Sequence, residues 1–80
     1  MEETTLYNIS DIEDALVETT LDEVYTALAE RGFNPVNQIV GYLTTGDPSY
    51  ITSNKDARNK ILSIDRGKLI ETIVRKYLEG

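Results

Sequence analysis

The chain has 80 residues, a net charge of −6, and neither cysteine nor histidine. Disulfides, thiolate metal sites and thiol nucleophiles are therefore excluded, and the commonest general base is missing. The carboxylates have no metal-loop spacing, and pairing two of them for hydrolysis would need a pocket that the sequence does not predict. We therefore expect a protein without enzymatic activity, cofactor or metal. A domain of this size buries only a modest fraction of its surface and is marginally stable alone. We therefore expect self-association to add to its stability.

Charge is distributed unevenly along the chain. Residues 1–31 contain nine acids and one base, whereas residues 32–80 contain five acids and seven bases. The acidic part is either a solvated arm or a segment that docks on the basic half. The overall charge argues against nucleic acid and anionic membranes as partners. There is no apolar run of the roughly 20 residues that span a bilayer and no signal-peptide pattern, so we expect no membrane insertion and a cytoplasmic location.

The first ten residues show no helical period, whereas the rest of the chain does. We expect residues 1–10 to form a flexible acidic arm and residues 11–80 to form a single helical domain. Capping-box patterns begin at Ser10 and at Thr20. They predict a short helix after the first and a longer one, stopped by Gly32, after the second.

The middle of the chain predicts another helix, with clear signals at both ends. Asn34 is a good cap, and Pro35 is preorganised for the first helical position. Gly46 ends this helix, and a short extended pair is expected near Tyr50 and Ile51. The apolar stripe of the helix comprises Val36, Ile39, Val40 and Leu43.

Two more helices are expected in the last third of the chain. Ser53 is the expected cap of the third helix, and Asp65 opens the last one. The last helix has apolar residues at steps of three and four, which predicts a buried stripe. They are Leu69, Ile70, Ile73, Val74, Tyr77 and Leu78. The whole chain therefore predicts an all-α fold, a compact small bundle of four to five short helices.

Gly41 lies inside a predicted helix, where glycine costs up to about 1 kcal/mol relative to alanine. Such a glycine usually permits close approach of another backbone, and Tyr42 beside it offers a large apolar area. The contact lies either within the chain or between two copies, and both hold if a dimer shares one core. We expect a homodimer with Ile39, Gly41, Tyr42 and Leu43 at its interface.

The two helices on either side of Gly32 superficially suit a helix-turn-helix. The second helix of that motif has to meet phosphates and base edges. Residues 35–45 contain no Lys or Arg. Nothing there supplies the electrostatic footprint of a nucleic-acid site, so we expect no nucleic acid as partner.

A long, ordered series of positions resembles a known family. These are Tyr25, Leu28, Gly32-Phe33-Asn34-Pro35, Asn37-Gln38-Ile39-Val40-Gly41-Tyr42, Gly46-Asp47-Pro48, Tyr50-Ile51 and Lys55-Asp56-Ala57-Arg58-Asn59. Over nearly the whole chain, the sequence resembles the IreB family of small regulatory phosphoproteins from low-GC Gram-positive bacteria. The resemblance implies a compact helical homodimer with a flexible N-terminus.

The same resemblance implies a function. Family members are phosphorylated on an N-terminal threonine by a membrane Ser/Thr kinase with PASTA repeats, and a cognate phosphatase opposes it. They act as negative regulators in cell-envelope stress and cephalosporin resistance, through a downstream protein that stays unknown. The acidic-acidic-threonine pattern of the family matches Glu2-Glu3-Thr4, which makes Thr4 the candidate phosphoacceptor and Thr5 its neighbour. Without the resemblance the two threonines are an ordinary polar tail, and the alternative function is a constitutive dimeric adaptor.

Overall fold

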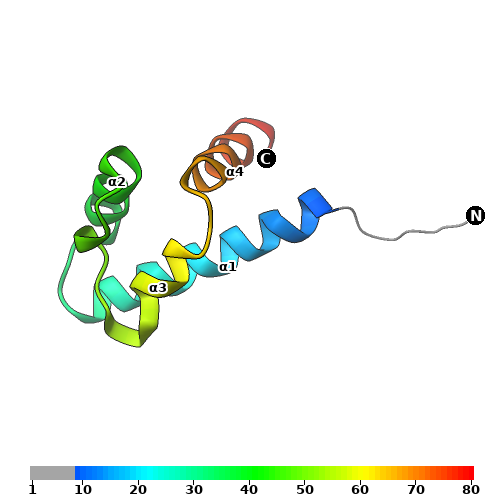
Figure 1. Cartoon of the computed structure of the whole chain (residues 1–80). Helices are drawn as coiled ribbons and strands as arrows, with labels where there is room; N and C mark the ends of the chain where they lie inside the picture. The colour runs from blue at the N-terminus through cyan, green and yellow to red at the C-terminus, as the bar shows by residue number, and fades with distance from the viewer. Residues whose placement is uncertain (1–8) are drawn as a thin grey trace, which may run out of the picture.

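The computed structural model describes residues 9–80, which form four α-helices and two short 3-10 turns. The elements are α1 (Ile9–Glu30), α2 (Pro35–Thr45), η1 (Pro48–Tyr50), η2 (Asn54–Asp56), α3 (Ala57–Leu62) and α4 (Arg66–Glu79). The long helix α1 is the base of the fold, and α2, α3 and α4 each pack against it (Figure 1). The prediction of an all-α fold is confirmed. The predicted arm, apart from its last two residues, lies outside the described residues.

The helix α1 is continuous, so the predicted break at Thr20 is wrong. Neither Gly nor Pro occurs between residues 9 and 30. Thr20 is only 5 % exposed and lies on the buried side of the helix with Val17 and Val24. Because this buried side continues through Thr20, tertiary packing stabilises one long helix. No helix begins at Thr20, so its side chain does not act as a cap.

The predicted ends of α2 are confirmed. The side chain of Asn34 accepts a hydrogen bond from the Asn37 amide at 3.0 Å, and Pro35 follows at the first helical position. At the other end Gly46 has a φ of 75°, and its amide donates to the Tyr42 carbonyl. A left-handed residue at this position satisfies a carbonyl that the helix would otherwise leave open.

The predicted extended pair near Tyr50 and Ile51 is wrong, since residues 9–80 contain no strand. The side chain of Asp47 instead accepts a bond from the Ser49 amide at 2.9 Å and starts the turn η1. Ile51 alone is extended, with φ −108° and ψ 124°, and its side chain is fully buried. The apolar residue that suggested a strand therefore serves as a core anchor between two turns.

Ser53 does not cap α3, so that prediction is wrong as well. The chain instead turns through two left-handed residues, Lys55 (φ 54°) and Asp56 (φ 62°), before α3 begins. This unusual backbone is held from outside: the Asn54 side chain donates at 3.1 Å to the Ala27 carbonyl near the end of α1. Hydrogen bonds between residues far apart in the sequence can stabilise a strained turn. A capping pattern includes only neighbouring residues, so it could not predict this turn.

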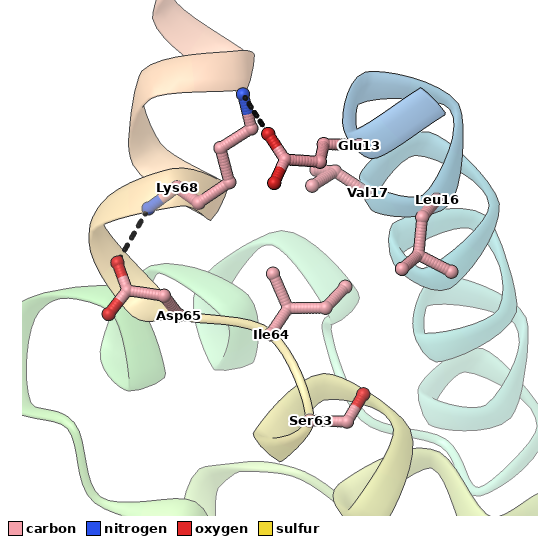
Figure 2. A pocket seen from close by; sticks show the side chains of 7 residues that line it. All are labelled: Glu13, Leu16, Val17, Ser63, Ile64, Asp65 and Lys68. Atoms are coloured by element: carbon pink, nitrogen blue, oxygen red, sulfur yellow. Dashed lines mark hydrogen bonds and ion pairs between the residues drawn. The ribbon is translucent and has the colours of Figure 1, made fainter. Parts of the chain in front are cut away.

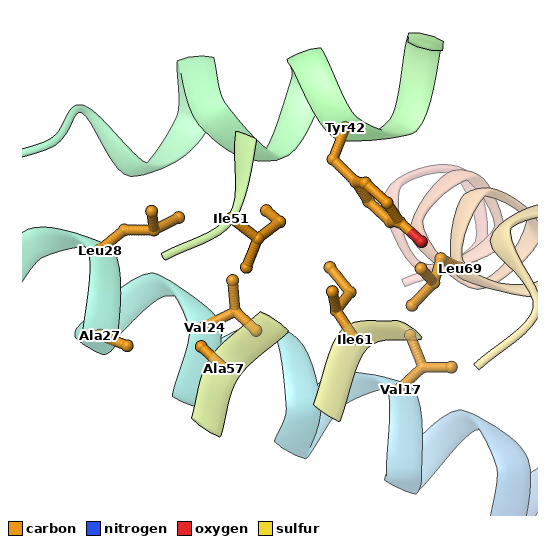
Figure 3. Packing of buried hydrophobic residues seen from close by; sticks show 9 residues of the cluster. All are labelled: Val17, Val24, Ala27, Leu28, Tyr42, Ile51, Ala57, Ile61 and Leu69. Atoms are coloured by element: carbon orange, nitrogen blue, oxygen red, sulfur yellow. The ribbon is translucent and has the colours of Figure 1, made fainter. Parts of the chain in front are cut away.

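The core lies where α1, α2, α3 and the start of α4 meet (Figure 3). Its buried residues are Val17, Val24, Ala27, Leu28, Tyr42, Ile51, Ala57, Ile61 and Leu69. The predicted stripe of α2 is only half right, because Ile39 and Leu43 pack against this core whereas Val36 and Val40 are 61 % and 50 % exposed. The residue of α2 that is buried in this core is instead Tyr42.

Candidate functional site

The predicted phosphoacceptors Thr4 and Thr5 lie outside the described residues. The helix α1 begins at Ile9, five residues after Thr4. A chain of five residues spans at most about 18 Å. Among the described residues, the first turns of α1 are therefore the ones joined to Thr4 by the shortest stretch of chain.

The N-terminal half of α1 is tied to α4 through the carboxylate of Asp14. One oxygen accepts a bond from the Arg75 guanidinium at 2.7 Å. The other accepts from the Thr72 hydroxyl at 3.1 Å and lies 3.3 Å from the ammonium of Lys68. The Asp14 side chain is 15 % exposed, and Thr72 is 1 % exposed. We call these four residues the Asp14 network.

The Asp14 network changes the titration of its members. Burial raises the pKa of the Asp14 carboxyl, but hydrogen bonds from Arg75, Lys68 and Thr72 outweigh this effect and hold the pKa below its usual range. Asp14 is therefore ionised at neutral pH. This cluster was not predicted from the sequence. A usable signal existed, because Lys68, Thr72 and Arg75 recur at steps of four and three and so share one side of a helix.

The side of α4 away from the Asp14 network is apolar and exposed. The predicted buried stripe of this helix is therefore wrong for all members except Leu69, which is fully buried. The outer face of α4, as we call it, consists of Ile70, Ile73, Val74, Tyr77 and Leu78, between 37 % and 87 % exposed. Apart from Leu69, the buried or half-buried residues of α4 are polar, and its apolar residues are exposed. A contiguous exposed apolar surface of this kind is typical of a protein–protein contact.

The four residues predicted for a dimer interface are largely occupied within the chain. Tyr42 is 4 % exposed, and Ile39 and Leu43 pack against the core. A Cβ at Gly41 would overlap the ring of Tyr50. The close contact that Gly41 permits is therefore one within the chain. The assignment of these residues to a dimer interface stays a prediction.

A pocket of about 260 Å³ lies between α1 and the segment that joins α3 to α4 (Figure 2). Leu16, Val17 and Ile64 supply its apolar wall. Glu13 and Lys68 lie at its edge, with 3.6 Å between carboxylate and ammonium. An apolar hollow with a charged edge suits one anchoring side chain of a partner better than a cofactor.

Metal binding and membrane insertion gain no support from residues 9–80. That part of the chain has no cluster of three or more His, Cys, Asp or Glu side chains arranged to hold a metal ion. Among the same residues, no helix combines the length and the apolar character that crossing a membrane requires.

Comparison with known families identifies the chain. The sequence matches the family model described as "IreB regulatory phosphoprotein" over residues 2–79. The match includes both the helical body and the acidic residues that precede α1. The chain therefore belongs to the IreB family of regulatory phosphoproteins.

Proposed function

We propose that the chain is a non-enzymatic, cytoplasmic regulator that is switched by phosphorylation of Thr4. The kinase is a PASTA-type membrane Ser/Thr kinase, and a cognate phosphatase reverses the reaction. Membership of the IreB family is the observation that carries this proposal. The regulator acts in cell-envelope stress and cephalosporin resistance, as a negative regulator and through a downstream protein.

The charge pattern supports a switch at Thr4. A phosphate adds about −1.5 to −2 charges at neutral pH. It would do so in a region, residues 1–31, whose nine acids already face only one base. The added charge is close to α1 in the sequence. The acids of α1 pair with bases that belong to α3, α4 and the turn before α3. Phosphorylation therefore changes the electrostatic surface at one end of the molecule and needs no change in the core.

Incubation with the cognate kinase, followed by mass mapping, tests the site. We expect one phosphate on Thr4 in the wild-type chain and in Thr5→Ala, which is the matched control. Thr4→Ala should lose that phosphate. Modification confined to residues within 9–80, with none at Thr4 or Thr5, would rule out the assignment.

We further propose that the regulator is a homodimer. The outer face of α4 supports this proposal, because it brings five exposed apolar residues together on one side of a helix. The five residues of the outer face are themselves uncharged. A neutral apolar surface can meet its own copy without repulsion. Ile39 and Leu43 of α2 keep only a small exposed area to add to such a contact.

The alternative function is a constitutive dimeric adaptor without a switch. The exposed apolar faces favour it, since they are present in the chain without any phosphate. The two functions differ in one respect only: an adaptor responds alike to every substitution at Thr4.

A further inference from the structure

The first turns of α1 have an apolar stripe that no described residue covers. Ile9, Ile12 and Leu16 follow one another at steps of three and four, so they share one side of the helix. Their exposed fractions are 73 %, 58 % and 56 %. We call this stripe the open face of α1. Single exposed apolar residues are ordinary, but a contiguous stripe marks a contact surface.

The open face continues the side of α1 on which α3 packs. Ile9, Leu16 and Ala27 fall on one side by helical spacing, and Ala27 lies in the core with Ile61 of α3. The helix α3 has only six residues and ends at Leu62, and α1 extends well past it (Figure 1). The open face is about 10 Å long, or two helical turns. It is an empty continuation of a helix-packing surface.

The open face ends at the pocket between α1 and the segment before α4. Leu16 belongs to both, and Ile64 forms the opposite wall (Figure 2). A helix lying in line with α3 would therefore find an apolar floor and, at one end, a hollow of about 260 Å³ for one anchoring side chain. Anchor residues in such hollows dominate the binding energy of helix-in-groove contacts.

The charges of α1 indicate what kind of partner chain can bind the open face. The helix α1 contains seven acids and no base. On the α4 side these acids are neutralised, for example by Arg75 at Asp14 and by Lys76 at Glu18. Beside the open face Glu13 is about half exposed and lies 3.6 Å from Lys68, a base that it shares with Asp14. Because the helix that carries this face has seven acids and no base, two such helices would repel each other, whereas Lys and Arg on a different chain would be attracted.

We propose that the open face of α1 and its pocket bind an amphipathic helix of another protein. That helix presents apolar residues spaced at i, i+3 or i+4, and i+7, with Lys or Arg beside them. This inference describes the chemistry of the downstream partner. It rests on the proposed function in one respect, namely that the regulator acts through such a partner. Thr4 lies five residues before Ile9, the first residue of the open face, so a phosphate there would add negative charge to the segment that precedes this face.

A synthetic peptide tests the proposal without a kinase, so its failure is separate from failure of the phosphorylation site. The probe is a 14-residue amphipathic helix with Leu on one side and Lys on the other, added to the unphosphorylated, ¹⁵N-labelled full chain. We expect saturable amide shifts in the first turns of α1 and in residues 62–65. Leu16→Glu should weaken binding at least tenfold, and Tyr25→Glu should not. Tyr25 is matched because it lies on the same helix, is 51 % exposed and receives the same charge.

Four results would overturn the proposal. They are absence of saturable binding, shifts that map elsewhere, equal affinity in Leu16→Glu, and equal affinity for a peptide with Glu in place of Lys. A fifth concerns the occupant: a wild-type dimer that Leu16→Glu dissociates would assign the open face to a second copy. Leu16 is 56 % exposed, so the variant should fold, and its circular dichroism should match that of the wild type.

Discussion

Asp14 is the side chain on which the contact between the start of α1 and α4 depends. Its carboxylate receives bonds from Arg75 and Thr72 and neighbours the ammonium of Lys68. Asp14→Asn leaves these donors without their charged acceptor, so we expect a lower urea midpoint of unfolding at pH 7. Because the pKa of Asp14 is lowered in the folded chain, its stabilisation is present above the unfolded value of about 3.9 and is lost as pH falls through the folded pKa. The variant should lack that acid-dependent step.

Glu18→Gln is the matched control for this prediction. Glu18 also joins α1 to α4, through Lys76 at 3.0 Å, but both side chains are about half exposed. Ion pairs at such exposed positions contribute little to stability. Equal midpoints for Asp14→Asn and the wild type between pH 2 and pH 7 would contradict the role that we assign to Asp14.

Local residue signals predicted both ends of α2 and the start of α4, but they failed at Thr20 and Ser53. Asn34, Pro35, Gly46 and Asp65 act as expected, because a cap needs only its immediate neighbours. Thr20 failed, because the same residue type suits a cap and a buried helix side. The Asp14 network was not predicted at all, since it joins residues about 60 positions apart that only the fold brings together.

At the scale of elements, α4 shows why an apolar period does not identify a core. The spacing of its apolar residues correctly predicted a helix, but it wrongly predicted which side of that helix is buried. Of its apolar residues only Leu69 is fully buried, because the polar side with Lys68, Thr72 and Arg75 makes the contact with α1. Sequence periodicity reports that a stripe is apolar and cannot distinguish burial within one chain from burial against another.

Ile73→Glu tests the outer face of α4 as a dimer contact. A carboxylate placed in an apolar interface loses its hydration without gaining a partner, so we expect at least tenfold weaker association by sedimentation equilibrium. Helix content should stay unchanged, because Ile73 is 37 % exposed in the single chain. Val36→Glu, at a 61 % exposed site of α2, is the control and should keep the dimer. The opposite pattern would place the interface on α2.

At the scale of the whole molecule, architecture and regulation are separated along the chain. Residues 34–51 form a helix, its caps and a turn. The proposed switch at Thr4 precedes the first helix in the sequence. Membership of the family could be predicted from the sequence. The exposed faces could not, because exposure depends on how the helices pack.

The phenotype of two Thr4 variants tests the central claim most directly. Strains whose only copy is Thr4→Ala or Thr4→Glu are compared with the wild type for cephalosporin resistance, at equal protein levels. A phosphorylation switch predicts that the two variants differ from each other, because one stays uncharged and the other partly imitates the phosphate charge. Identical resistance in both variants and the wild type would contradict the switch and favour the constitutive adaptor.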